Sequence, residues 1–445
     1  MANGNLPPGW VWTTVKDVVS VLETGGRPKG GAKGITSGVP SLGGEHLLYS
    51  GGFDFENIRY VPEEYFQNMK KGRIKKNDVL VVKDGATTGK TSFVDDNFPF
   101  PQAAVNEHVF ILRTLSISLP KFLFYWFQSP NGQECIKDNF QGTAQGGITS
   151  RFVENSTFPL PPLPEQERIV ERIESLFTRL DAGVAALKRA RAALRRYKAS
   201  LLKAACEGRL VPQDPQDEPA EELLRRLGKK PLEGDGLGEL PKGWCWGILE
   251  ELSSNANYGT STKCDYAENE YPVIRIPNII SGNVDTGDLK FAVDGSGLRD
   301  KDSLSPGDLI IIRTNGSKDL IGRCAFIHKP LHRKLYFASY LIRYKIINFE
   351  IIGTWIVTIW DSLLIRAYLE NVISTTAGQY NLNIVKLNKV PIPLPPLNEQ
   401  MRIVAEVERR LSLVQELEQT IEPSLKRAAR LRQAILKRAF EGRLV

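Results

Sequence analysis

The sequence predicts an α+β fold: a pseudo-twofold tandem repeat of two α/β domains that are separated by two long antiparallel, coiled-coil-like helices. Two observations predict it. Three blocks recur in the same order at a single offset, and each copy ends in a long run of heptad-spaced apolar residues. The expected divisions are domains over residues 1–164 and 240–398, spacer helices over 165–211 and 399–445, and a linker over 212–239.

The duplication is visible in three blocks. LPPGWVW at 6–12 returns as LPKGWCW at 240–246, PLPPLPEQERIV at 159–170 as PLPPLNEQMRIV at 393–404, and LLKAACEGRLV at 201–211 as ILKRAFEGRLV at 435–445. The offset is 234 residues in all three, and 11 of the 19 residues aligned between 158–176 and 392–410 are identical. Chance does not place three collinear blocks at one offset, so the second half is a copy of the first.

Each half is expected to begin with a turn and a strand, because Leu-Pro-x-Gly-Trp places proline and glycine before apolar residues. The β-branched runs DVLVV at 78–82 and DLIIIR at 308–313 predict short buried strands. These two runs are 230 residues apart, so the second half is about four residues shorter at this point.

Helices are expected after these strands, over residues 121–129 and 354–372. An offset of 234 aligns Trp126 with Trp360, and both tryptophans are expected in the core. The proline-rich segments FPLPPLPEQ and IPLPPLNEQ come next. Their prolines fix an extended path, so a helix can begin only after the last proline.

Two long amphipathic helices are predicted, one at the end of each half. The first has apolar residues spaced by seven at Ile173, Leu180, Leu187, Leu194 and Leu201, with a companion seam at Ile169, Leu176, Gly183, Ala190, Tyr197 and Ala204; the second has Ile403, Val407, Val414, Leu417, Ile421, Ala428, Leu431 and Ile435. A helix with one apolar stripe cannot bury that stripe against itself. We therefore expect the two helices to pair antiparallel as a spacer or partner-binding element. Pro423 is expected to kink or split the second helix.

The loop VLVVKDGATTGKT at 79–91 ends in Gly-Lys-Thr and suggests a nucleotide-binding loop. A Walker loop needs the pattern G-x-x-x-x-G-K-[ST] between a strand and a helix. The first glycine would stand at Asp84, and the following SFVDDNFPFPQ is a poor helix with two prolines. The corresponding loop RTNGSKDLIG at 313–322 has no Gly-Lys-Thr. An NTPase that uses Lys90 is therefore the less favoured alternative.

The composition favours a polyanionic partner, because the net charge is +7 and the pI is near 9.0. The five cysteines form no C-x-x-C and the four histidines form no zinc pattern, so no metal or other cofactor is expected. His328 and His332 are interpreted as ordinary loop residues because Pro330 lies between them. No membrane span or N-terminal signal is predicted, and the expected compartment is the cytoplasm.

The first long helix carries an unbroken cationic run. Residues 185–203 contain no acidic residue and seven basic residues, namely Lys188, Arg189, Arg191, Arg195, Arg196, Lys198 and Lys203. Such a run is either a solvated helix face, a surface for DNA phosphates or a surface for an acidic partner protein. The sequence leaves these three alternatives open.

These features resemble the specificity subunit of type I restriction–modification systems. The resemblance covers the whole chain and rests on the repeated Leu-Pro-x-Gly-Trp openings, PLPPLPEQ and PLPPLNEQ, the EGRLV helix ends, and the loops KDGATTGK and RTNGSKDLIG. It implies a non-catalytic subunit whose two target-recognition domains bind the two parts of a split, asymmetric double-stranded DNA site. It also implies a helical spacer and two adenine-methylating modification subunits, joined in the full prokaryotic complex by ATP-driven restriction subunits.

The loops that follow the two buried strands carry the candidate DNA contacts. Arginine and lysine suit guanine, asparagine suits adenine, and hydroxyl groups suit phosphate. The candidates are Lys83, Thr87, Thr88, Lys90 and Gln145 in the first half and Arg313, Asn315, Ser317, Lys318 and Gln379 in the second. For each of them, turn chemistry or solubility is the alternative role. The alternative for the whole chain is a stand-alone DNA-binding regulator that needs no modification subunit.

Overall fold

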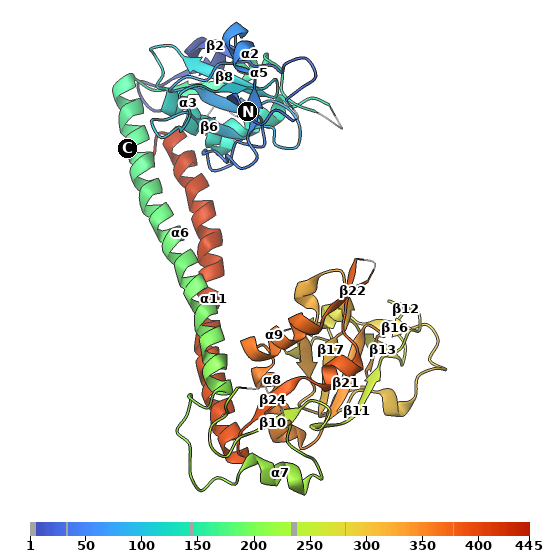
Figure 1. Cartoon of the computed structure of the whole chain (residues 1–445). Coiled ribbons are helices and arrows are strands. Elements are labelled where there is room, and N and C mark those ends of the chain that lie inside the picture. The colour runs from blue at the N-terminus through green and yellow to red at the C-terminus, as the bar shows by residue number, and fades with distance from the viewer. Residues whose placement is uncertain (1–5, 33, 143–145, 233–237, 281, 377) are drawn as a thin grey trace. The chain divides into compact units, whose positions relative to one another are not determined.

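The computed structural model describes residues 6–32, 34–142, 146–232, 238–280, 282–376 and 378–445 (Figure 1). The chain divides into two compact units: unit 1 comprises Met1–Lys188 with Ile421–Val445, and unit 2 comprises Arg189–Thr420. Each unit contains one of the repeated domains and a part of both long helices, α6 (Leu163–Cys206) and α11 (Leu397–Phe440). The expected α+β tandem repeat with two long helices is confirmed.

The domain of unit 1 is built on a four-stranded antiparallel sheet of order β2–β8–β5–β6 and a smaller sheet of order β4–β3–β7. Strand β1 pairs with β9, so the opening strand lies beside the strand that leads into α6. The elements before α6 are β1 (Val11–Thr14), α1 (Val15–Val18), β2 (Val19–Thr24), β3 (Val39–Leu42), β4 (Arg59–Val61), α2 (Glu63–Asn68), β5 (Val79–Val82), β6 (Thr91–Phe93), β7 (Ala104–Val105), β8 (Val109–Thr114), α3 (Pro120–Gln128), α4 (Pro130–Asp138), α5 (Phe152–Asn155) and β9 (Thr157–Leu160).

Strand β5 has four consecutive apolar residues because both faces of the sheet are covered. Val79 and Val81 pack in one core cluster with Trp126 of α3. Leu80 and Val82 point to the other face and pack in a separate cluster. Side chains alternate across a strand, so a run without polar residues is typical of a strand that is buried on two sides.

Unit 2 repeats this topology. Its four-stranded sheet has the order β11–β21–β17–β19, and β10 pairs with β24 as β1 pairs with β9. It also has sheets of order β12–β16–β13–β20, β18–β23–β22 and β14–β15. The elements are α7 (Ala220–Arg226), β10 (Cys245–Ile248), β11 (Ser253–Tyr258), β12 (Cys264–Asp265), β13 (Pro272–Ile274), η1 (Ile276–Asn278), β14 (Ile279–Ile280), β15 (Asn283–Val284), β16 (Lys290–Ala292), η2 (Asp300–Asp302), β17 (Asp308–Ile312), β18 (Thr314–Asn315), η3 (Lys318–Leu320), β19 (Cys324–Phe326), β20 (Tyr336–Phe337), β21 (Leu341–Ile346), the π-helix η4 (Phe349–Gly353), α8 (Thr354–Ile359), α9 (Leu363–Val372), β22 (Ser374–Thr376), β23 (Gln379–Asn381), α10 (Ile384–Asn388) and β24 (Pro391–Leu394).

The helical segments of the two domains align one residue away from the sequence prediction. Ser129 caps α4 and Ser362 caps α9, each by accepting a backbone N–H with its hydroxyl oxygen. These equivalent caps are 233 residues apart, so Trp126 corresponds to Ile359 and not to Trp360. Both tryptophans are buried, as expected, at 1% exposure each. Aromatic matching misplaced the register because the cap, and not the tryptophan, is the shared feature.

Helices α6 and α11 run antiparallel beside each other within each unit (Figure 1). Arg432 forms an ion pair with Asp181 over 2.8 Å in unit 1. Lys198 forms one with Glu418 over 2.7 Å in unit 2. Residue numbers therefore fall along α11 as they rise along α6, which agrees with the expected antiparallel arrangement.

The seam between the helices differs in part from the heptad prediction. Ile173, Leu201, Val407, Val414, Ile421 and Ile435 are buried, and Leu180, Leu187 and Leu194 are half-buried. In the companion seam, Gly183, Ala190 and Tyr197 are exposed, and the half-buried residues stand one position later. Leu417 and Leu431 of α11 are 53% and 49% exposed. A helix with 3.6 residues per turn drifts away from a strict seven-residue repeat, which moves one of the two seams.

The prediction that Pro423 splits the second helix was wrong, because α11 is continuous across it. A proline inside a helix removes one backbone N–H donor. The carbonyl that loses this donor belongs to Gln419, and both residues are exposed. Water can therefore accept the role of the missing donor without a break in the helix.

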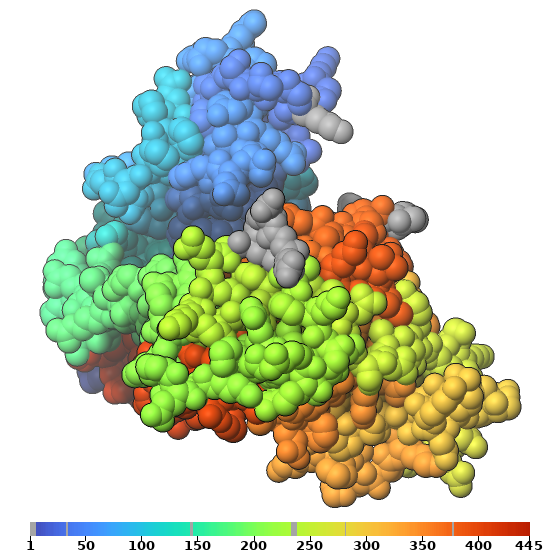
Figure 2. Space-filling view, turned by 60° about the horizontal axis from the view of Figure 1, so that its bottom comes forward, coloured from blue at the N-terminus to red at the C-terminus, as the bar shows by residue number. Residues whose placement is uncertain are grey.

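The segment predicted as a linker is docked along part of its length. Helix α7 buries Ala220, Leu223 and Leu224 in the core of unit 2. Arg402 of α11 forms an ion pair with Asp217 over 2.6 Å, and the Asp217 side chain is only 5% exposed. Figure 2 shows the green segment that contains α7 lying on the surface of unit 2. This segment is therefore part of the unit 2 surface.

No single helix in the described ranges has the length and apolar composition of a membrane span. One bent pair, Phe349–Ile359 with Leu363–Val372, meets the length and composition test jointly, with an angle of 76° between its parts. Trp355, Ile356 and Leu369 of this pair are fully buried in the domain core.

Candidate nucleic-acid interface

Three loops of unit 1 meet at one edge of the four-stranded sheet. Strand β5 ends at Val82, which pairs with Val109 at the start of β8. Strand β2 ends at Thr24, which pairs with Phe110 of the same strand. Residues 83–90, 106–108 and 25–32 therefore lie at this edge, which we call the loop edge of unit 1. It contains every first-half candidate that the structure describes.

The loop from Lys83 to Lys90 is held by its own backbone. The N–H of Gly89 donates to the carbonyl of Val82 over 2.9 Å, and the N–H of Lys90 donates to that of Thr87 over 3.1 Å. The Thr88 hydroxyl donates to the carbonyl of Gly85 over 2.7 Å, so it stabilises the turn. Gly85 and Gly89 have φ angles of +84° and +88°, which only glycine adopts easily.

The two lysines of this loop lie over aromatic rings. The ammonium of Lys90 is 5.2 Å from the ring centre of Tyr49, whose side chain is 65% exposed. The ammonium of Lys83 is 5.9 Å from the ring centre of Phe110. No helix follows the loop, since β6 begins at Thr91. The phosphate-binding helix N-terminus of a Walker loop is therefore replaced by a strand.

The sequence analysis missed a charged network at this edge. His108 Nδ1 lies 2.5 Å from Asp84 Oδ1, and His108 Nε2 lies 3.4 Å from Glu107 Oε1. Glu107 also pairs with Arg27 over 2.8 Å. These residues are up to 81 positions apart, so no local motif joins them. The pairing of β2, β8 and β5 brings them together, and strand register is the only sequence signal that points to it.

A second chain segment pairs with the same loop. The N–H of Ile148 donates to the carbonyl of Lys83 over 2.6 Å, and Asp84 forms a bridge with Gly147. The expected neighbourhood of the loop and the segment around Gln145 is therefore present. Gln145 itself lies outside the described residues.

Unit 2 has a corresponding loop edge. Arg313 follows β17 directly, and β18 pairs with β23, so Asn315 lies opposite Tyr380. The Thr314 hydroxyl donates to Gln379 Oε1 over 3.5 Å. The structure thus brings Gln379 to the loop that holds the other four second-half candidates, although 61 residues separate it from Lys318.

The candidates in unit 2 differ in how free their polar groups are. Arg313 donates from Nη1 to the carbonyl of Ser339 over 3.0 Å, and its guanidinium carbon lies 4.7 Å from the ring centre of Tyr258. The Oδ1 atom of Asn315 accepts the N–H of Ser317 over 2.8 Å, which leaves its amide donor for a ligand. Lys318 is exposed. This set can donate to base edges and to phosphates.

A buried carboxylate supports each sheet at the end opposite to the loops. Asp78 accepts two hydrogen bonds from Arg113, over 2.7 and 2.9 Å. Asp308 lies 3.4 Å from Lys345 Nζ and is fully buried. Burial raises the pKa of both carboxyls, and the neighbouring cations oppose that shift. These groups stabilise the fold and lie outside the loop edges.

No metal-binding cluster of three or more histidine, cysteine, aspartate or glutamate side chains occurs within the described residues. In the cationic run of α6, Lys198 contacts Glu418 of α11, while Lys188, Arg189, Arg195 and Arg196 are exposed. This exposed face is compatible with DNA phosphates and with an acidic protein.

The fold and its two loop edges define a binding protein with two related but chemically unlike interaction edges. The family model described as "Type I restriction modification DNA specificity domain" matches residues 7–186 and 241–427. These matches span most of the chain. The chain therefore belongs to the type I restriction–modification DNA specificity family, whose members select a DNA sequence and are not catalytic themselves.

Individual relatives agree with this assignment. The type I restriction enzyme EcoKI specificity subunit of Escherichia coli is 24% identical over 456 residues, which cover 100% of this chain and 91% of that protein. The StySPI specificity subunit of Salmonella potsdam is 25% identical over 448 residues, with the same coverage of 100% and 91%. The expected family and the expected non-catalytic, DNA-specificity role are confirmed.

Solved structures agree on the fold. A chain from a structure titled for complex assembly and conformational transition of the type I R-M system superposes with a TM-score of 0.67 at 19% identity, covering 99% of this chain and 100% of that one. The HsdS subunit from Thermoanaerobacter tengcongensis superposes with a TM-score of 0.53 at 19% identity and 99% coverage of both chains.

Proposed function

We propose that the two units bind the two halves of a bipartite, asymmetric DNA target through their loop edges. The observation that carries this proposal is the repeated geometry with unlike side chains. In each unit, the loop after the central strand meets a second segment at the same sheet edge. Lys83 and Asp84 in unit 1 correspond to Arg313 and Thr314 in unit 2. Different side chains at equivalent positions select different bases.

The candidate residues divide by chemistry. Lys83, Lys90, Arg313 and Lys318 suit guanine edges or phosphates, and Asn315 and Gln379 suit adenine. Thr87, Thr88 and Ser317 suit phosphate, and Gln145 stays a prediction from sequence. In support, the Asn315 amide nitrogen and the Lys318 ammonium face no partner that would prevent contact with DNA within the described part of unit 2.

The paired helices are proposed as the spacer that fixes the distance between the half-sites. Each contains 44 residues, which corresponds to a length of about 66 Å. Two binding elements on one face of B-DNA must lie about 34 Å apart, or a multiple of that distance. A buried seam with residues such as Val414 and Ile421 makes a stiff element, which a flexible linker is not.

The chain is proposed to recruit two adenine-N6 methyltransferase subunits and, in the full complex, ATP-dependent restriction subunits in a prokaryotic cytoplasm. The internal repeat supports two equivalent modification subunits. Apolar side chains that the helix pair leaves exposed, such as Leu413 and Leu417 at 52% and 53%, support a protein partner along α11. The exposed cationic face of α6 is available to DNA or to an acidic partner.

Mapping methylated adenines tests the proposal. A host that carries this chain and its modification subunits should methylate one split sequence. Replacing residues 13–158 with the matching segment of another specificity subunit should change only one half of that sequence. If both halves changed, modular recognition would be wrong. Purification of the native protein without any modification subunit would instead support a stand-alone regulator.

A further inference from the structure

Each unit has a groove between its domain and a long helix, at equivalent positions. In unit 1 the carbonyl of Gly51 accepts the N–H of Phe93 over 3.3 Å, and in unit 2 the carbonyl of Gly282 accepts the N–H of Phe326 over 3.0 Å. These segments line one wall of each groove. A glutamate of the neighbouring long helix lines each groove as well: Glu174 in unit 1 and, 234 residues later, Glu408 in unit 2.

The groove of unit 1 is filled by the chain's own side chains. Lys121 Nζ lies 2.6 Å from Glu174 Oε1, and the Tyr125 hydroxyl donates to the same oxygen over 3.4 Å. Arg432 covers Phe177, with 3.9 Å between its guanidinium carbon and the ring centre. The remaining cavity has a volume of only about 230 Å³.

The groove of unit 2 lacks these filling groups. The shared serine caps place Thr354 and Thr358 where unit 1 has Lys121 and Tyr125. Their hydroxyls donate to carbonyls of their own helical segment, over 2.9 Å from Thr354 and 2.7 Å from Thr358. Glu408 therefore receives no hydrogen bond or ion pair from any residue that the structure describes, and the cavity is about 990 Å³.

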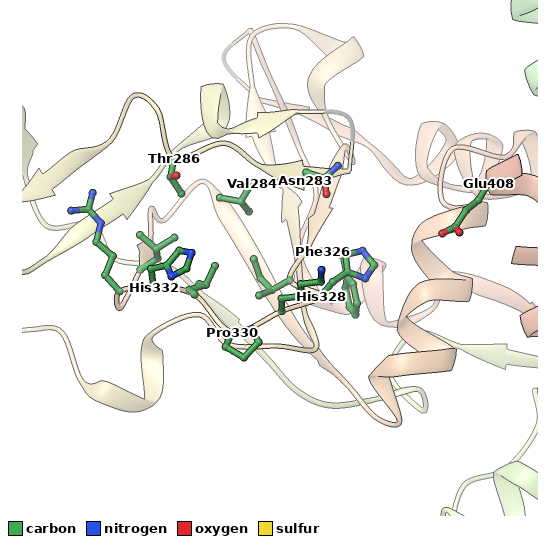
Figure 3. Close-up of a pocket in the computed structure, with 13 residues that line it drawn as sticks. Asn283, Val284, Thr286, Phe326, His328, Pro330, His332 and Glu408 are labelled. Carbon is green, nitrogen blue, oxygen red and sulfur yellow. The ribbon is translucent and has the colours of Figure 1, made fainter. Parts of the chain in front are cut away.

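The other wall of the unit 2 groove is basic, and its floor is apolar. The wall is the loop His-Lys-Pro-Leu-His-Arg-Lys at 328–334. Arg333 and Lys334 pair with Glu268 and Asp300, over 3.3 and 2.8 Å, whereas Lys329 has no ion pair among the described residues. The floor includes Val284, Phe326, Leu331 and Leu335. Figure 3 shows Glu408 on α11, across the cavity from Val284 and His328.

DNA does not fit this groove. Phe326 pairs with Leu309 at the start of β17, whereas the loop edge follows Ile312 at the end of that strand. The two sites are thus at opposite ends of the sheet. An unpaired carboxylate on the groove wall would also repel phosphates. The occupant must instead offer a cation to Glu408, an apolar group to the floor and a carboxylate to Lys329.

We propose that this groove binds a segment of the modification subunit that carries a basic residue next to an aromatic or aliphatic residue, with an acidic residue facing Lys329. In unit 1, Lys121 and Tyr125 occupy the equivalent space, so they are an internal model of the ligand chemistry. The inference rests on the proposed recruitment of modification subunits. It adds that the two subunits are held unequally, because only unit 2 offers an open groove.

Charge reversal at the groove tests the inference. The variants are Glu408→Lys and Lys329→Glu, with Glu370→Lys and Lys389→Glu as exposed, charge-matched controls on the same unit. Binding of the full-length chain to purified modification subunit is measured by titration calorimetry, which also gives the number of subunits bound. Both groove variants should weaken one of two binding events at least tenfold, while the controls and the affinity for DNA stay unchanged.

Closing the groove from inside is an independent test that does not remove Glu408. Thr354→Lys with Thr358→Tyr installs the unit 1 side chains, so the double variant should bind one modification subunit at least tenfold more weakly. Its thermal unfolding should match the wild type. Unchanged binding in this variant and in Glu408→Lys would overturn the groove and leave the proposed function intact.

Other outcomes are equally decisive. A wild-type chain that binds no modification subunit would overturn the proposed function and this inference together. A wild-type chain that self-associates in sedimentation experiments, and loses that association in Glu408→Lys, would assign the groove to a second copy of the chain and overturn the inference.

Discussion

The indole nitrogen of Trp244 donates a hydrogen bond to the carboxylate of Glu399 over 3.0 Å. Trp10 and Glu165 make the same contact over the same distance in the other half. Each bond joins the opening turn of a domain to the first turn of a long helix. The repeated Leu-Pro-x-Gly-Trp and Glu-Gln motifs are therefore two sides of one structural contact, which fixes how the domain sits on its helix.

Removing the acceptor of this bond should destabilise unit 2 more than unit 1. Glu399 is 1% exposed, so Glu399→Ala leaves the Trp244 N–H buried without an acceptor. We expect a loss of about 1–3 kcal/mol in the free energy of unfolding. Glu165→Ala should cost less because Glu165 is half-buried and water can replace it. Urea unfolding followed by tryptophan fluorescence measures both.

The control for this variant is Glu399→Gln, which keeps a carbonyl oxygen as the acceptor. Burial raises the pKa of Glu399, so its charged form costs free energy as the pH rises through that pKa. Glutamine removes this cost and should retain most of the stability at neutral pH. If Glu399→Ala were as stable as Glu399→Gln, the hydrogen bond would not hold the domain on the helix.

Two neighbouring residues of the unit 2 loop edge should have different effects on DNA binding. Asn315→Ala should relax the base preference at one position of one half-site, at a cost of about 1–3 kcal/mol, because a base contact carries sequence information. Lys318→Ala should weaken binding to all sequences and lower the salt slope by about 1, because a phosphate contact releases one counterion. Binding titrations at several salt concentrations, with methylation mapping in the host, separate the two effects.

The other half-site provides the control for these variants. Neither substitution should alter the base preference of the half-site assigned to unit 1, because the loop around Lys83 belongs to a separate sheet. A change in that half-site would show that the two recognition edges are not independent. An unchanged preference in Asn315→Ala would remove Asn315 from the candidates.

The observed seam between the helices predicts a contrast between two residues one turn apart. Ile435 is 8% exposed and Leu431 is 49% exposed. Ile435→Ala should lower the free energy of unfolding by about 2–5 kcal/mol because it leaves a cavity. Leu431→Ala should change it by less than about 0.5 kcal/mol. Equal losses would restore the heptad assignment that places both residues in the seam.

The sequence predicted what depends on periodicity and repetition. The duplication, the strands VLVV and LIII and the buried seam at Ile173 and Val414 all follow from spacing. The companion seam could not be predicted, because a real helix departs from the seven-residue repeat and the partner decides which flank is covered. The contact of Asp84 with His108 could not be predicted either, because strand register creates it. The groove at Glu408 depends on two threonines that carry no motif.

The buried thiols predict a loss of stability in alkali. Burial raises the pKa of Cys206 to about 11 and that of Cys245 to about 12, from an ordinary value of 9.0. Below pH 9 both the folded and the unfolded thiols are protonated, so they add no pH dependence. Between pH 9 and the folded pKa only the unfolded chain releases the proton, so stability falls, by up to about 3 kcal/mol for each thiol. Urea unfolding between pH 7 and 11 measures this loss.

Alkylation with iodoacetamide at pH 8, followed by mass spectrometry, tests the same assignment by a route that needs no unfolding curve. The buried Cys206 and Cys245 should react far more slowly than Cys264, which is partly exposed and has a smaller barrier to the reagent. Their reaction should accelerate when urea unfolds the chain. In Cys206→Ala, the part of the alkaline stability loss that belongs to this thiol should disappear, even though the variant starts from a lower stability. Fast modification of Cys206 or Cys245 in the folded chain at pH 8 would contradict the buried, protonated state of these thiols and, with it, the packing of the α6 end against the domain of unit 2.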